Sequence, residues 1–210
     1  MIDVAVQAEN WPEHDWQALA ERACCAAAAA SEFNAFLTYP TPIEIAIRLT
    51  SDAEVHALNR DYRDKDAPTN VLSFPMLEGE ELADLISAHP ERSRGTTSSE
   101  VEKLGHVDLG SARISPSTSL GMSGDCEDAE TPEPETLLGD IILAYETCAR
   151  EAAIKNIRLE AHATHLIVHG TLHLLGYDHI DDDEACVMET LERTIMAGLG
   201  LHDPYDDEDD

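Results

Sequence analysis

The sequence predicts one folded domain in which helices and strands are interspersed, interrupted by a long insertion. Short apolar runs with the period of a strand are separated by longer segments of helical composition. Residues 78–136 are instead rich in Ser, Thr, Gly, Pro and acidic side chains, and they far exceed an ordinary loop, for which about 12–15 residues is already long. We therefore expect residues 1–77 and 137–202 to form the domain, the insertion to be largely disordered, and residues 203–210 to be an acidic tail.

The first three elements are expected to be a strand, a helix and a second strand. Residues 1–7 alternate weakly between apolar and polar side chains, as a half-buried strand does. Residues 15–36 are rich in Ala and contain neither Gly nor Pro, which predicts a helix. Pro40 and Pro42 then break the chain, and residues 43–50 alternate with a period of two, which predicts a strand.

A second helix and a third strand are expected next. Ser51 and Glu54 have the spacing of a capping box, in which the two side chains bond to backbone amides at the start of a helix. We expect this helix to run to about Arg63 and to be followed, after a turn, by a strand over residues 71–75.

The chain after the insertion is expected to contain one strand and three helices. Residues 139–146 form an apolar run typical of a strand, and residues 147–175 have a helical pattern that divides near Asn156. Gly176 is expected to end the second of these helices. The acidic residues from Asp181 onward fit the first turn of a last helix.

The charge of the chain argues against general nucleic-acid binding. The formal net charge is -30, and a protein of this charge repels phosphate backbones. The insertion and the acidic tail hold much of the charge, as solvated segments often do. One short stretch, with Arg60, Arg63 and Lys65, reverses the sign and predicts a small positive patch.

The cysteines and the N-terminus indicate a cytoplasmic protein. The five cysteines are scattered and contain no Cys-x-x-Cys pair, so we expect buried or free thiols in a reducing compartment. The first residues have no basic start and no apolar run, so no secretory signal is expected. No stretch approaches about 18 uncharged apolar residues, so no membrane span is expected.

Three histidines late in the chain have the spacing of a metal site. His169 and His173 are four residues apart, so on a helix their rings leave the same face one turn apart. Gly176 permits the positive φ that ends the helix abruptly, and the turn can bring back His179 as a third ligand. This is the ligand spacing of the metzincin zinc proteases. Three neutral imidazoles suit Zn²⁺ and leave its fourth position open, which favours a catalytic site over a structural one.

Two further histidines lie upstream on nearly the same helical face. His165 and His169 are also four apart and form a rival pair, and His162 precedes them. We prefer His169, His173 and His179 as the ligands because only there does a turn supply the third one. His165 is then expected to have a supporting or structural role.

The residue after the first histidine separates this chain from the metzincin peptidases. Those enzymes have Glu at that position, where its carboxylate is the general base. Here the position is Gly170, which cannot take a proton. A peptidase would need a base from elsewhere. Asp178 could act as a local base, but it could equally orient His179 or cap the next turn.

Residues 169–179 resemble the signature of the YbeY family, the zinc-dependent endoribonucleases of bacterial ribosomal RNA maturation. The family pattern His-Gly-x-Leu-His-Leu-x-Gly-Tyr-Asp-His is present in full. Residues 58–75 resemble the family's stretch with Tyr-Arg and Val-Leu-Ser-Phe, and residues 138–144 resemble its Leu-Gly-Asp-Ile strand. With the flanking elements, the resemblance covers most of the chain in the family's order.

The resemblance implies an α+β fold in which helices pack on a small mixed β-sheet, with a zinc site at the end of a helix that is followed by a Gly turn. It implies one Zn²⁺ per chain, bound by His169, His173 and His179, with Arg63 and His173 as catalytic residues. A guanidinium can grip a phosphate and stabilise charge that develops in the transition state. The long insertion and the extreme acidity depart from compact members of the family.

The implied function is that of a cytoplasmic, single-strand-specific, zinc-dependent endoribonuclease that matures the 3′ end of small-subunit (16S) ribosomal RNA and serves ribosome quality control. The implied partners are ribosomal RNA and the small ribosomal subunit, with ribosomal proteins or an assembly GTPase as further candidates, and no membrane. Two alternatives stay open. One is a zinc hydrolase of another class, such as a metzincin-like peptidase, and the other is a non-catalytic ribosome-assembly factor.

Overall fold

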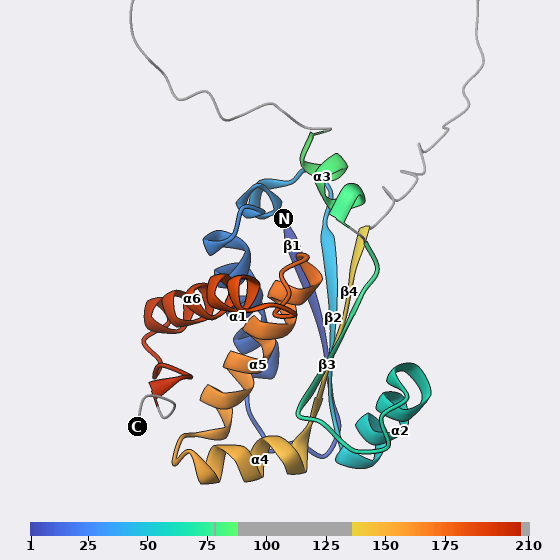
Figure 1. Ribbon diagram of the computed structural model, residues 1–210, viewed down its shortest axis with the longest axis vertical. Coiled ribbons are helices and arrows are strands. Elements are labelled where there is room, and N and C mark those ends of the chain that lie inside the picture. The colour runs from blue at the N-terminus through green and yellow to red at the C-terminus, as the bar shows by residue number, and fades with distance from the viewer. Residues whose placement is uncertain (78, 88–135, 207–210) are drawn as a thin grey trace, which may run out of the picture. The chain divides into compact units, whose positions relative to one another are not determined.

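A four-stranded mixed sheet carries the fold, and its strands lie in the order β1-β2-β4-β3 (Figure 1). In this computed structural model β1 (Ile2–Ala8), β2 (Ile43–Thr50) and β4 (Thr136–Ala144) are parallel, and β3 (Val71–Pro75) pairs antiparallel with β4 at one edge. The structure describes residues 1–77, 79–87 and 136–206. The expected α+β fold with a small mixed sheet is confirmed.

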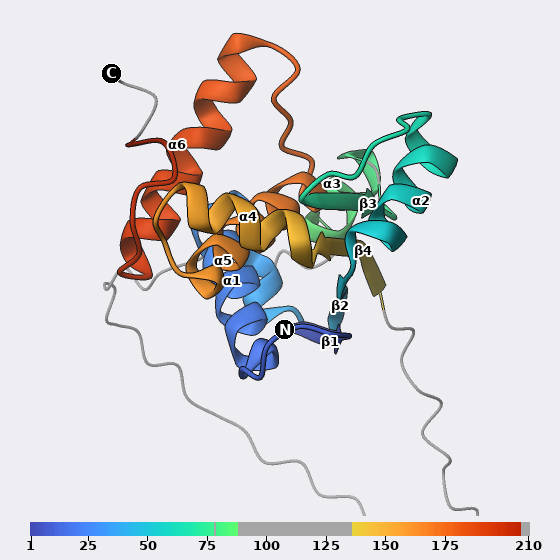
Figure 2. The ribbon, with the colours of Figure 1, turned by 90° about the horizontal axis from the view of Figure 1, so that it is seen from below.

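Helices α1 and α5 cover one face of the sheet, and α2 lies on the other (Figures 1 and 2). α1 (Trp16–Ala30) and α5 (Leu159–Leu174) pack against each other and against the strands, and α6 (Asp182–Gly198) packs on both helices. α2 (Asp52–Arg63) contributes Val55 to a small cluster with β3 and β4. The main core therefore lies between the sheet and the layer formed by α1, α5 and α6. Helix α5 contributes several of its buried residues.

The alternation of β2 explains why one sheet face is buried. Ile43, Ile45, Ile47 and Leu49 are all buried in the main core, and the side chains between them are more exposed. Successive side chains of a strand point to opposite faces, so the four aliphatic residues share one face. The period-two prediction for this strand is confirmed with its bounds.

The helices after β4 begin and end close to the expected residues. α4 (Tyr145–Ile154) follows β4 directly and packs against α5, and Asn156 makes the turn between them with a φ of 52°. Asp181 caps α6, because its carboxylate accepts the N–H of Glu184 at 2.9 Å. None of the helices in the described part of the chain has the length and hydropathy needed to cross a membrane.

The first helix is shorter than expected. It ends at Ala30 rather than near residue 36, because the hydroxyl of Ser31 donates to the carbonyl of Ala28 and accepts the N–H of Phe33. A short side chain that bonds to nearby backbone offers the chain an alternative to further helix. A 3₁₀ helix, η1 (Asn34–Thr38), follows.

The predicted capping box at the start of α2 does not form. Ser51 occupies the N-cap position, but its side chain makes no capping hydrogen bond. The carboxylate of Glu54 instead accepts from the hydroxyl of Thr50 at 2.6 Å and pairs with Arg48 at 2.9 Å. The N–H of Asp52 donates to Glu146 of α4 at 2.8 Å, so tertiary partners replace the local ones.

Regular structure extends into the range expected to be an insertion. α3 (Gly79–Ser87) lies within residues 78–136, and Leu82 on this helix is buried in the main core. Residues 88–135 lie outside the described residues, as do residues 207–210 of the expected acidic tail.

Candidate metal centre

Helix α5 ends in a glycine turn just after His173. Gly176 has a φ of 87°, a conformation that favours glycine. The N–H groups of Gly176 and Tyr177 donate to the carbonyls of His173 and Leu172, which is the Schellman pattern of a helix end. The expected helix stop is confirmed, and the turn returns the loop that carries His179.

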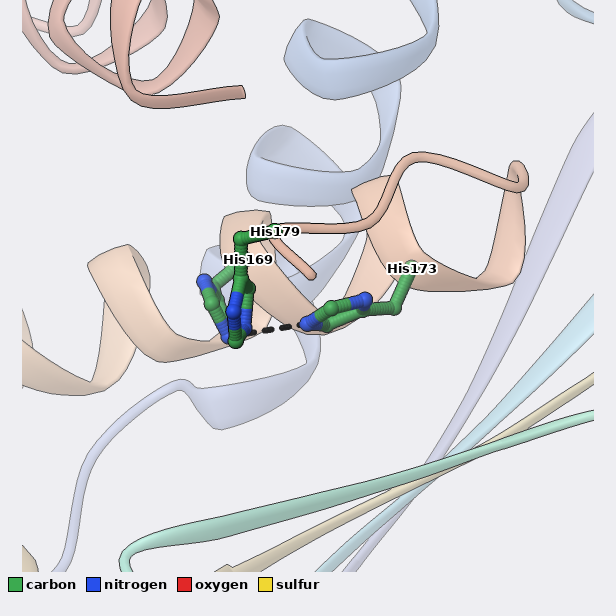
Figure 3. A group of neighbouring side chains, drawn as sticks. All are labelled: His169, His173 and His179. Carbon is green, nitrogen blue, oxygen red and sulfur yellow. Dashed lines mark hydrogen bonds between the residues drawn. The ribbon is translucent and has the colours of Figure 1, made fainter. Parts of the chain in front are cut away.

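The turn brings three histidines together (Figure 3). His169 and His173 from α5 and His179 from the loop each offer a ring nitrogen, and these atoms all lie within 4.8 Å of one another. The Nε2 atoms of His169 and His173 are 3.1 Å apart. No other such group of potential metal ligands occurs within residues 1–77, 79–87 and 136–206. The three residues predicted as ligands are those that the structure groups.

The Nδ1 atoms of two of the rings have hydrogen-bonding partners in the protein. The Nδ1 of His173 lies 3.0 Å from the carbonyl oxygen of Tyr177, which can only accept, so this nitrogen carries the proton. The Nδ1 of His169 lies 2.7 Å from a carboxylate oxygen of Glu192 and donates to it. With a proton on Nδ1, each ring presents a bare Nε2 to the same point. Two lone pairs at this distance repel each other unless a cation lies between them, so the donor set fits Zn²⁺.

His173 remains neutral in weakly acidic solution. Its pKa is lowered from 6.5 to about 4, first because the ring is buried and then because of the neighbouring His169 and His179. The bond to the carbonyl of Tyr177 acts in the opposite direction but does not outweigh these effects. Because an imidazole binds a metal only when it is unprotonated, the site holds His173 ready for a metal ion.

A buried carboxylate that was not predicted from the sequence lies next to the histidines. Glu192 of α6 accepts hydrogen bonds from His165, His169 and Tyr205. Burial alone would raise the pKa of this carboxyl, but the hydrogen bonds from the two histidines outweigh burial and lower it. The carboxylate is therefore charged at neutral pH.

The position of Glu192 carries a sequence signal, whereas that of Tyr205 does not. The other buried residues of α6 are Met188, Ile195 and Met196, and Glu192 falls on the same helical face. A carboxylate on an otherwise apolar face needs hydrogen-bonding partners in the core. Tyr205 lies in the segment expected to be an acidic tail, where no periodicity marks it.

The two upstream histidines do not join the group of three. His165 donates through Nε2 to Glu192 at 2.6 Å, so the rival pair with His169 is not formed. His162 lies against Glu151 of α4, with its Nε2 2.9 Å from the carboxylate. His165 and His169 thus bond to the same carboxylate, that of Glu192.

A cleft of about 470 Å³ opens beside the histidines. Its lining consists of Arg63, Ser73, Pro75, Leu77, Gly79, His173, Gly176, Tyr177, Asp178 and His179. Arg63, in the last turn of α2, donates from Nη2 to the carbonyl of Ser73 at 3.3 Å. The side chain of Asp178 accepts the N–H of His179 at 2.8 Å, which orders the loop. The structure thus brings Arg63 and His173 to one cleft.

The position of the metzincin base has no room for a side chain. A Cβ atom on Gly170 would lie 2.9 Å from Cγ2 of Ile141 and 3.1 Å from Oγ of Ser73. Both neighbours belong to the sheet, so this side of α5 packs against β3 and β4. Glycine thus favours the close approach of helix and sheet, and a glutamate at this position would have to displace Ile141.

Comparison with known proteins gives one family over nearly the whole chain. The sequence profile described as "Endoribonuclease YbeY" matches residues 2–200. A relative named Endoribonuclease YbeY from Rhizorhabdus wittichii is 48% identical over 207 residues, covering 98% of this chain and 97% of its own. Relatives of the same name from Sphingopyxis alaskensis and Zymomonas mobilis are each 43% identical, and cover 96% and 94% of this chain and 95% and 88% of their own.

Proposed function

The chain belongs to the family of YbeY endoribonucleases, and we propose that it cleaves RNA phosphodiester bonds at the histidine centre. The proposed cofactor is one Zn²⁺ held by His169, His173 and His179. The observation that carries the proposal is the pair of facing Nε2 atoms, 3.1 Å apart, at the edge of a cleft that Arg63 also lines.

The metal site and the residues of the cleft would have different roles in such a reaction. A Zn²⁺ ion in this position would supply a Lewis acid for a phosphate oxygen and would lower the pKa of a coordinated water toward about 7. Arg63 offers a planar, permanently charged fork that matches phosphate oxygens and stabilises the charge of the transition state. His173, which lines the cleft and bonds to Tyr177, keeps its ring fixed and neutral.

We propose single-stranded RNA of the small ribosomal subunit, near the 3′ end of 16S RNA, as the substrate, and the cytoplasm as the location. The family name supports cleavage within RNA. The net charge of -30 disfavours capture of free RNA, because the body of the protein repels phosphate. The small subunit itself, with a ribosomal protein or an assembly GTPase bound to it, would then present the strand to the cleft.

The proposal is tested with the purified full-length chain, the variant His173→Ala, and the matched control His56→Ala. His56 is a partly exposed histidine on α2 whose ring pairs with Asp66, away from the centre. Each protein is loaded with Zn²⁺ and given structured ribosomal RNA or casein at physiological salt. We expect zinc-dependent cuts in RNA that are lost in His173→Ala and kept in His56→Ala.

The other outcomes identify the alternatives. Cleavage of casein would indicate a peptidase with a base outside the helix. Retained zinc with neither activity would indicate an assembly factor without catalysis. A 2′,3′-cyclic phosphate at the new RNA ends would show that the 2′-hydroxyl of the RNA attacks, and a 5′-phosphate with a 3′-hydroxyl would show that water does.

A further inference from the structure

Glu192 is the one carboxylate of the described residues that is buried in the core. Its side chain has no exposed surface, and it lies on α6 facing α5. A buried carboxylate is tolerated only when donors satisfy its oxygens. Glu192 has three donors, and each comes from a different position in the chain: His165, His169 and Tyr205.

The two oxygens of Glu192 have separate partners. Oε1 accepts from Nδ1 of His169 at 2.7 Å. Oε2 accepts from Nε2 of His165 at 2.6 Å and from the hydroxyl of Tyr205 at 2.6 Å. These distances are in the range of hydrogen bonds to a charged acceptor. Two donors on Oε2 prevent the carboxylate from rotating, so Oε1 stays directed at His169.

The contact with Oε1 decides how His169 can act. A proton on Nδ1 leaves Nε2 bare, and Nε2 is the atom that faces His173. A negative charge behind the ring also raises the electron density on Nε2, which strengthens a bond to a cation. Without the carboxylate the proton could move to Nε2 and block the side that faces the other histidines.

Tyr205 is held in place by contacts that do not involve Glu192. The ammonium of Lys155 donates to the carbonyl of Pro204 at 3.3 Å, and Arg193 pairs with Asp203 at 3.4 Å. The guanidinium of Arg193 lies 4.9 Å from the centre of the Tyr205 ring. The segment after α6 is therefore anchored to α6 and to the residue that follows α4, and loss of the phenolic hydroxyl alone should leave it docked.

We propose that Glu192 is a positioning residue of the metal centre and that the hydroxyl of Tyr205, acting through Glu192, couples the docked C-terminal segment to metal affinity. The inference rests on the proposed function, because it takes His169 to be a ligand. The inference assigns a role to the segment after α6, which neither lines the cleft nor belongs to the group of three histidines.

The test compares the full-length chain with Glu192→Gln, Tyr205→Phe and the control Tyr62→Phe, which removes a phenolic hydroxyl from an exposed side chain of α2. Metal-free proteins are titrated with Zn²⁺ against a coloured chelator, and the tautomer of His169 is read by ¹⁵N NMR without metal. Glu192→Gln removes the charge at nearly constant shape, and we expect its Zn²⁺ affinity to fall about 10–100-fold. Tyr205→Phe should lose less, about 3–10-fold, which is the size of one ordinary hydrogen bond, because the hydroxyl acts only through Glu192. Tyr62→Phe should stay within about twofold of the wild type, because Tyr62 does not line the cleft.

The tautomer signal separates this inference from the proposed function. We expect His169 to carry its proton on Nδ1 in the wild type and to become a mixture of tautomers in Glu192→Gln. Unchanged affinity and tautomer in both Glu192→Gln and Tyr205→Phe would overturn the inference even if the wild type binds zinc and cuts RNA. An equal loss in Tyr62→Phe and Tyr205→Phe would also overturn it, since it would mean that the loss does not depend on the contact with Glu192. If the wild type binds no zinc, the proposed function fails, whatever the tautomers show.

Should Glu192→Gln fail to fold, Tyr205→Phe still decides the question. It deletes one oxygen and leaves the buried carboxylate with two donors. Unfolding by urea in the absence of metal checks that each variant is folded before its affinity is compared.

Discussion

The Nε2 atoms of His169 and His173 face each other at 3.1 Å, while the opposite nitrogen of each ring is held by a separate part of the fold. For His169 that partner is Glu192 on α6, and for His173 it is the carbonyl of Tyr177 in the glycine turn. Contacts with the protein thus orient both rings. A ligand pair that is already ordered loses little conformational entropy on binding, which favours tight binding.

Replacement of Arg63 is expected to reduce catalysis without loss of metal. Arg63→Ala removes the one guanidinium that lines the cleft among the described residues, and we expect RNA cleavage to fall about 10²–10³-fold, as when a donor to transition-state charge is removed. Zinc content, measured by elemental analysis, should remain one per chain. Arg60→Ala is the matched control, since Arg60 lies on the same helix, is exposed and pairs with Asp61. Equal losses in the two variants would mean that only the net charge of α2 matters.

The stability of the metal-free protein is expected to depend on pH through His173. The pKa of His173 is about 4 in the folded protein and near 6.5 in an unfolded chain. Between these values the unfolded chain binds a proton that the folded protein does not, so the free energy of unfolding falls as the pH is lowered from 6.5 to 4. In His173→Asn this part of the loss should be absent. Urea unfolding of both metal-free proteins at pH 7 and pH 4.5 gives the comparison, and equal losses would contradict the prediction.

Substitution of Gly170 is expected to destabilise the contact between α5 and the sheet. In Gly170→Ala the new Cβ would press on Ile141, which is fully buried and cannot move away easily. We expect a loss of about 1–3 kcal/mol in the free energy of unfolding, despite the better helix propensity of Ala. Gly198→Ala on α6 is the control, because nothing lies within 4 Å of its Cβ. That change should be neutral or slightly stabilising, and a similar loss in both would argue against a steric cause.

The cysteines are expected to differ strongly in reactivity. Burial raises the pKa of the Cys24 and Cys148 thiols to about 12, so almost no thiolate is present at pH 8. Cys186 is exposed and should react with iodoacetamide in the native protein. Peptide mass spectrometry before and after denaturation checks this. Rapid native labelling of Cys24 would show that the helix layer opens. Cys126 lies outside the described residues, and its peptide is scored separately.

The sequence indicates local features well where the cause is local. Gly176 ends α5 because only glycine adopts its positive φ without strain, and the spacing of His169 and His173 follows from the period of the helix. The capping box at Ser51 and Glu54 is the counter-example. Its spacing is correct, yet Glu54 bonds to Thr50 and Arg48 because the fold supplies these partners.

The sequence by itself determined the strands, the helix that carries His169 and His173, and the glycine turn that returns His179. Each depends on periodicity or on backbone conformation within a few residues. Only the tertiary structure decided that Glu192 would accept a hydrogen bond from His169 and that Arg63 would line the same cleft as His173. These contacts join residues far apart in the chain, and they form because burial of apolar faces packs α6 on α5 and α2 on the sheet. No local pattern encodes which polar side chains meet when those faces close.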